Sequence, residues 1–104
     1  MAVTSKALAR TSAATTSTTL YTAPNTSTTA IVTDIVITNA STSFATATIA
    51  LDGVALIADI PVAADSLISF DLKQVLPASD PAKTITGFAS TTGVKFHISG
   101  VEIV

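Results

Sequence analysis

The single histidine, His97, is the residue of this chain best suited to acid–base chemistry, because its ordinary pKa lies closest to neutral pH. A Ser-His-Asp arrangement would have to use it, with the serine and the aspartate supplied by other parts of the fold. His97 lies in the stretch VKFHIS, where it alternates with apolar residues and shares a face with Lys95 and Ser99. This position is typical of a surface strand residue, so we expect no catalytic residue and no enzymatic activity.

The other groups that bind metals or cofactors are few or scattered. One His and no Cys cannot supply the usual zinc ligand set. Asp34 and Glu102 would form a calcium site or an acid–base couple if they met across strands, but simple exposure of such carboxylates is far more common. The four glycines are isolated, so there is no glycine-rich phosphate loop. We therefore expect no metal and no cofactor.

The composition of the chain argues against nucleic acid and membranes as partners. The chain has 104 residues, which suits one domain, and its net charge of −2 with 12% charged residues offers no basic patch to neutralise nucleic-acid phosphates. Its mean hydropathy is high, at +0.63, but the richest apolar window, residues 45–64, is broken by Asp52, Asp59 and Pro61. A membrane span needs about 20 mostly apolar residues, and the N-terminal residues lack the apolar run of a secretory signal. We expect neither nucleic acid nor a membrane as partner.

Apolar residues recur with period two from residue 18 onward, which is the pattern of half-buried strands. The clearest runs are residues 30–38, 44–51, 54–60, 66–72, 83–90 and 94–104. Turn residues separate these runs, and Asp52-Gly53 is a preferred type I′ turn that joins two of them as a tight hairpin. The predicted fold class is all-β, an antiparallel β-sandwich of about seven short strands.

Two of these runs indicate which side chains share a face. In residues 30–38 we expect Ile31, Thr33, Ile35 and Ile37 on one face and Val32, Asp34, Val36 and Thr38 on the other. In residues 94–104 the alternation changes phase at Gly100, and a glycine at a phase change predicts a β-bulge. The inward set expected there is Val94, Phe96, Ile98, Val101 and Ile103.

Residues 1–17 are rich in Ser, Thr and Ala and show no consistent period, so we expect a flexible, extended N-terminal arm followed by a β-sandwich domain at 18–104. Lys6 and Arg10 are the only charged residues of the first thirty, and we expect them to contact an acidic surface of a partner. Tyr21 lies at the border between arm and domain. We expect its side chain to be at least half buried with a hydrogen-bonded hydroxyl, and to serve as an amphipathic anchor for a partner.

The surface carries little charge for an all-β protein. Exposed strand edges are usually protected by Lys, Pro or inward charges, yet this chain has five Lys and Arg residues in all, and its outward positions are largely Thr, Ser and Ala. Such a surface suits a protein that is covered by neighbouring copies or by a larger surface, so we expect a homo-oligomer. A more distant alternative is a carbohydrate-binding or calcium-binding module, although Trp is absent and sugar stacking would fall to Tyr21.

Three motifs follow one another in a definite order. They are the start L-Y-T-A-P-N-T-S-T-T-A, the strand I-V-T-D-I-V-I-T-N and the finish V-K-F-H-I-S-G-V-E-I. This combination, above all Tyr21-x-x-Pro24 together with Ser99-Gly100-Val101-Glu102, resembles a group of small structural proteins of tailed bacteriophages. The resemblance covers residues 18–104 and leaves out the arm.

The resemblance implies a virion component with a β-sandwich core and no enzymatic activity. Within that class we expect a capsid decoration or cement protein that binds the major capsid protein or other virion proteins and stabilises the shell. The location implied is the virion, with the capsid surface favoured over the tail. A tail, neck or baseplate component is the second interpretation.

Overall fold

The alternating runs form strands because their β-branched residues fit the pleated, half-buried surface of a sheet. In a computed structural model, which describes residues 3–104, the strands are β1 (Val3–Ser12), β2 (Thr18–Thr22), β3 (Thr29–Asn39), β4 (Ala45–Leu51), β5 (Val54–Val62), β6 (Ser66–Leu76), β7 (Thr84–Ala89) and β8 (Val94–Ile103). Within this described part of the chain, no helix is long and apolar enough to cross a membrane. The all-β prediction is confirmed, and there is one strand more than expected.

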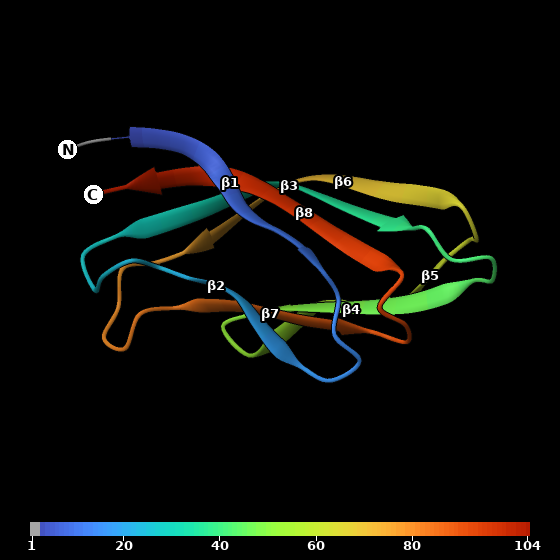
Figure 1. Cartoon of the computed structure of the whole chain (residues 1–104). Helices are drawn as coiled ribbons and strands as arrows, with labels where there is room; N and C mark the ends of the chain where they lie inside the picture. Colours follow the sequence, from blue (N-terminus) through green and yellow to red (C-terminus); the bar gives the residue numbers. More distant parts are fainter. Residues whose placement is uncertain (1–2) are drawn as a thin grey trace.

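The strands form two four-stranded sheets that pack face to face (Figure 1). Sheet A has the strand order β1-β8-β3-β6, sheet B has the order β2-β7-β4-β5, and every neighbouring pair is antiparallel. Because most successive strands alternate between the sheets, the chain winds around its core as a jelly roll. The edge strands β1 and β2 lie on one flank of the sandwich, and β6 and β5 lie on the other.

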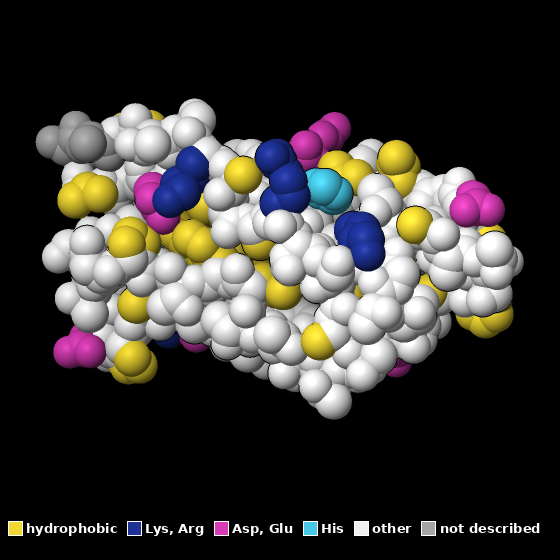
Figure 2. Space-filling model, viewed as in Figure 1, with side chains coloured by type: hydrophobic (Ala, Val, Ile, Leu, Met, Phe, Trp, Pro, Cys, Tyr) yellow, Lys and Arg dark blue, Asp and Glu magenta, His cyan; other side chains and the backbone are white. Residues whose placement is uncertain are grey.

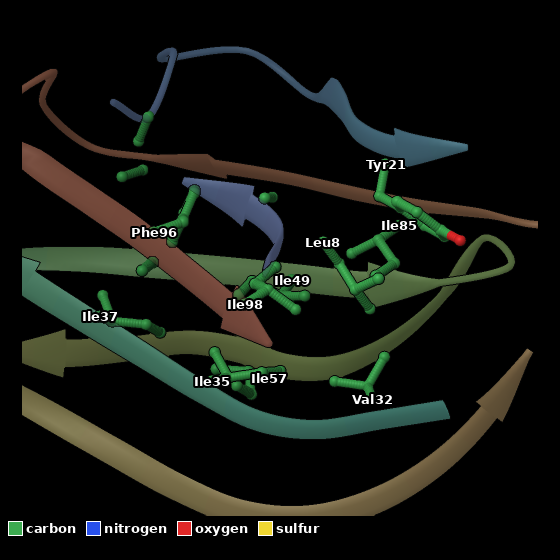
Figure 3. Packing of buried hydrophobic residues seen from close by; sticks show 14 of the residues in the cluster. Leu8, Tyr21, Val32, Ile35, Ile37, Ile49, Ile57, Ile85, Phe96 and Ile98 are labelled. Atoms are coloured by element: carbon green, nitrogen blue, oxygen red, sulfur yellow. The ribbon is translucent and has the colours of Figure 1, made fainter. Parts of the chain in front are cut away.

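One apolar core lies between the sheets. The largest fully buried apolar side chains come from β3, β4, β6, β7, β8 and the end of β5, and they are Val32, Ile35, Ile37, Ile49, Val62, Leu76, Ile85, Val94, Phe96 and Ile98. Figure 3 shows part of this layer, with Ile35, Ile49 and Ile98 between the two sheets. Full burial of one such side chain is worth about 1.5–3 kcal/mol, so this layer holds the two sheets together. The predicted turn between β4 and β5 is confirmed: Asp52 and Gly53 have φ angles of 54° and 77°, as a type I′ turn requires.

Strand β8 keeps its alternation to its end, so the predicted phase change at Gly100 is wrong. Gly100 and Glu102 face inward, while Val101 and Ile103 face outward. The irregularity lies in the two neighbouring strands instead, because β1 and β3 each place an extra residue, Leu8 and Thr33, against β8 at this level.

The glycine at position 100 is required by close approach of these neighbours. A Cβ atom there would collide with the carbonyl oxygen of Ile31 and would lie 2.8 Å from Cδ1 of Leu8. Leu8 is only 7% exposed, so its side chain fills the space that the glycine leaves free. The sequence therefore predicted a bulge at the correct level of the sheet, but the bulges lie in β1 and β3 and not in β8.

The extra residue Thr33 also changes which side chains of β3 share a face. Val32 is completely buried, whereas Ile31 is only partly covered and Thr33 is exposed. Beyond the bulge the alternation changes phase, and Ile35 and Ile37 are completely buried. A single inserted residue exchanges the two faces of a strand, so the prediction that Ile31 and Thr33 share a face with Ile35 and Ile37 is wrong.

The structure differs from the sequence prediction at the N-terminus. Residues 3–12 were expected in a flexible arm, but they form β1 and pair with β8 along the whole strand. The inward positions of β1 hold Lys6 as well as Leu8, and the bulge interrupts their spacing, so no apolar period is visible. Main-chain pairing and the burial of Leu8 and Ala9 nevertheless place this segment in the sandwich.

Replacement of Gly100 tests the close approach at the bulge. We expect Gly100→Ala to lower the free energy of unfolding by about 1–3 kcal/mol, because the added methyl group overpacks the site. The matched control is Gly53→Asn, where no neighbouring atom lies within 4 Å and Asn tolerates a positive φ. Urea unfolding of both variants measures the difference, and a Gly100→Ala variant as stable as the control would contradict the close approach.

Candidate functional site

Three polar residues close the flank formed by β1 and β2. Lys6 lies on β1 of sheet A, Glu102 lies on β8 beside it, and Tyr21 comes from β2 of sheet B. The Tyr21 hydroxyl donates a hydrogen bond to Oε2 of Glu102 at 2.5 Å, and Nζ of Lys6 lies 3.4 Å from Oε1 of the same carboxylate. We call these three residues the clasp, because their contacts join the edges of the two sheets.

The clasp depends on a carboxylate that faces the interior. Glu102 is 8% exposed, and a charge at such a position is costly unless its oxygens are hydrogen-bonded or paired. Tyr21 and Lys6 each engage one of the two oxygens. The ring of Tyr21 packs beside its cross-strand neighbour Ile85 (Figure 3), so the residue contributes apolar surface to the core as well as a hydroxyl to Glu102.

The environment of Tyr21 makes it a structural residue. Burial raises the pKa of its phenol above the ordinary value, and the hydrogen bond and negative charge of Glu102 raise it further. The phenol therefore keeps its proton at neutral pH and acts as a donor. The predicted burial and hydrogen bond of Tyr21 are confirmed. Since Tyr21 as a whole is only 8% exposed, it offers little surface for the partner contact expected of it. Contact of a partner by Lys6 stays a prediction.

A second group of charged residues lies on the outer face of sheet A. Arg10 on β1 is directly opposite His97 on β8, and Lys95 lies on the same outward side of β8. Together with Thr11 and Ser12 they line a shallow depression of about 230 Å³. Lys, Arg and the histidine gather on this part of the surface in Figure 2. We call Arg10, Lys95 and His97 the basic group, and its chemistry suits carboxylates or other anions.

The structure separates the two carboxylates that the sequence had offered as a couple. Glu102 faces inward opposite Ala30, whereas Asp34 faces outward between Ser99 and Asp71. The hypothesis of a calcium site or an acid–base couple built on Asp34 and Glu102 is therefore wrong. Among residues 3–104 no group of three or more His, Cys, Asp or Glu side chains is placed to hold a metal ion.

The sequence analysis predicted neither the role of Glu102 in the clasp nor the position of Arg10 beside His97. Unbroken alternation along β8 places Glu102 inward, two residues after Gly100 in the series that begins with Val94, Phe96 and Ile98. The expected phase change at Gly100 hid this signal. The approach of Arg10 to His97 could not be read from the sequence, because it depends on β1 joining the sheet. The outward position of His97 beside Lys95, by contrast, was correctly predicted.

No protein-family model matches this chain, and no curated protein matches it in sequence. Its fold does match solved structures of virus particles. A chain in the structure of infectious bursal disease virus, Gx strain, matches with a TM-score of 0.55 and 18% identity, covering 97% of this chain and 31% of that one. VP2 in a subviral particle of the same virus matches with a TM-score of 0.51 and 18% identity, over 97% of this chain and 31% of VP2.

These matches show the fold of the chain. At 18% identity they do not carry a function, and this chain spans less than a third of the length of the virus chains. A chain from Bacillus endospore appendages, described as disulfide-linked pili, also matches, with 17% identity over 96% of this chain and 84% of that one, but its TM-score of 0.45 is too low to support an argument.

Removal of the Tyr21 hydroxyl tests the clasp. We expect Tyr21→Phe to lower the free energy of unfolding by about 1–3 kcal/mol, because it leaves one oxygen of a buried carboxylate without a donor. The matched control is Lys6→Met, which removes the partly exposed partner of the other oxygen and should cost no more than about 1 kcal/mol. Urea unfolding provides the comparison, and equal losses in both variants would contradict the assigned roles.

The raised pKa of Tyr21 also predicts a loss of stability at alkaline pH. The unfolded chain releases the phenolic proton at about pH 10, whereas the native chain holds it to higher pH. Above about pH 10 the unfolded state therefore binds fewer protons than the native state, and stability falls as pH rises. This loss should be absent from Tyr21→Phe.

Ultraviolet absorbance of tyrosinate provides a direct measurement, because Tyr21 is the only tyrosine. We expect the native protein to ionise at higher pH than the same protein in urea. Ionisation at the same pH in both solutions would show that the phenol is not held by Glu102.

Proposed function

We propose that this chain is a structural protein of a virus particle that acts by contact and not by catalysis. The observation that carries the proposal is the jelly-roll order of its two sheets, together with the likeness of this fold to chains of virus particles. The chemistry of the residues agrees with this role. The one buried ionisable cluster, among the residues that the structure describes, is the clasp, and its groups are engaged with one another.

Within virus particles, we propose a capsid decoration protein of a tailed bacteriophage that binds the major capsid protein. The motif resemblance supports the phage class, and the small, poorly charged surface supports a role in lattice contacts. Many weak contacts on a symmetric shell give firm attachment without strong binding at any one of them. The basic group offers a place for such a contact with acidic side chains of the shell, which extends the expectation for Arg10 to Lys95 and His97.

A tail, neck or baseplate component is the second candidate, and the same features support it. Copy number separates the two, because a decoration protein occurs in many copies per particle and a baseplate protein in few. Quantitative mass spectrometry of purified virions makes this measurement. Absence of the chain from virions would overturn both. Glycan-array binding, or a rise in melting temperature with calcium, would instead favour the more distant carbohydrate-binding or calcium-binding module.

Replacement of the basic group tests the contact with the shell. We expect Arg10→Ser combined with Lys95→Ser to lower occupancy on particles that lack the protein by about tenfold, since charge-assisted contacts are lost. The matched control is Lys83→Ser, which removes one positive charge that is paired with Asp52 at 2.9 Å and lies outside the basic group. Occupancy is read from particle-bound protein after sedimentation, and equal occupancy of both variants would exclude this surface.

A further inference from the structure

The four edge strands differ in how well they are protected from pairing. Strand β1 carries a bulge at Leu8, and β2 has five residues with a shift in register. Strand β5 contains Pro61 and a residue of positive φ, Asp59. Strand β6 is the longest of the four, with eleven residues, no proline and no residue of positive φ, and its alternate residues from Ile68 to Leu72 keep their inward orientation. Its ladder with β3 shifts register once, between Asp71 and Gln74. Long edges with open N–H and C=O groups pair readily with another strand, and β6 is the longest such edge.

The flank of β6 is also the apolar side of the sandwich. Its inward residues Ile68, Phe70 and Leu72 pack against the core but are only partly buried. On its outward side Leu67 and Val75 are 59% and 51% exposed. The opposite flank is closed by the clasp, so the two flanks are not equivalent. A strand laid against β6 would cover apolar surface as well as main-chain groups.

The charged residues of β6 indicate which strand would pair with it. Asp71 and Lys73 are both exposed, two positions apart on the same side of the strand. Asp71 lies directly opposite Asp34 on β3, a like-charge pair that costs stability. Within residues 3–104 neither aspartate takes part in a salt bridge. A cation placed opposite Asp71 on its open side would offset this repulsion.

We propose that β6 pairs with β6 of a second copy of this chain, antiparallel and about a two-fold axis at Leu72. This register places Asp71 of each copy opposite Lys73 of the other. It places Leu72 opposite Leu72 of the second copy and brings Leu67 of one copy diagonally next to Val75 of the other, within reach of a side-chain contact. The contact is isologous, and it joins sheet A of both copies into one continuous sheet.

The same charges exclude the neighbouring registers. An axis at Asp71 would place aspartates opposite each other, and an axis at Lys73 would do the same with lysines. Repulsion in the wrong registers thus adds to attraction in the correct one, which makes the pairing specific. The inference does not depend on a virion role, because it concerns the isolated protein.

Charge exchange on β6 tests the register. Sedimentation velocity of the purified full chain should show a dimer that dissociates on dilution. We expect Asp71→Lys to weaken dimerisation by at least about tenfold, because it places lysines opposite each other twice. Lys73→Asp should weaken it similarly through opposed aspartates. The double variant Asp71→Lys/Lys73→Asp restores opposite charges and should dimerise like the original protein.

The control is Arg10→Glu, which changes charge on the far flank and should leave the dimer intact. Far-ultraviolet circular dichroism verifies that each variant is folded. A monomer at all concentrations, undiminished dimerisation of both single variants, or a folded double variant that stays monomeric would each overturn the proposal. A monomeric protein that still occupies virions would overturn the β6 contact alone and leave the virion role standing.

Discussion

The buried carboxylate of Glu102 is the constraint on which one flank of this sandwich depends. An inward-facing charge at the end of β8 must have donors, and they come from two strands that do not pair with each other, β1 through Lys6 and β2 through Tyr21. Strands β1 and β2 are thereby tied across the gap between the sheets. The clasp thus adds a side-chain link to the main-chain pairing that holds β1 in the sandwich, and Lys6 has an internal partner besides any external one.

The bulges at Leu8 and Thr33 determine which residues reach the surface. Both lie beside Gly100, whose missing side chain lets the neighbouring strands approach. Because each bulge reverses the faces of its strand, Arg10 points outward toward His97, and Asp34 points outward toward Asp71. The outward positions of Arg10 and Asp34 therefore follow from two inserted residues. The close packing around Gly100 thus lies at the level where the faces of β1 and β3 exchange, whereas Lys95 and His97 face outward through the unbroken alternation of β8.

Sequence patterns among neighbouring residues predicted most of the strands. They failed where a segment depends on contacts with residues far away in the chain. Period two and the Asp52-Gly53 turn identified β3 to β8, because both reflect backbone preferences of adjacent residues. The strand β1 has no such period, and only pairing with β8, far along the chain, makes it a strand. The burial of Tyr21 was predicted from its place beside a core strand. Its partner Glu102 was not, since an expected phase change at Gly100 hid the parity that turns this carboxylate inward.

The two flanks of the sandwich use their polar residues in opposite ways. On the β1 and β2 flank, Lys6 and Glu102 satisfy each other within one chain and leave little to offer a partner. On the β6 flank, Asp71 and Lys73 lie on one side of one strand, where they cannot face each other across a ladder, so their charges remain available to another strand. The clasp uses its charges between the two sheets of one chain, whereas the charges of β6 point away from the chain. The two flanks are therefore not equivalent, and a contact through β6 would be directed, since an isologous pair is complete with two copies.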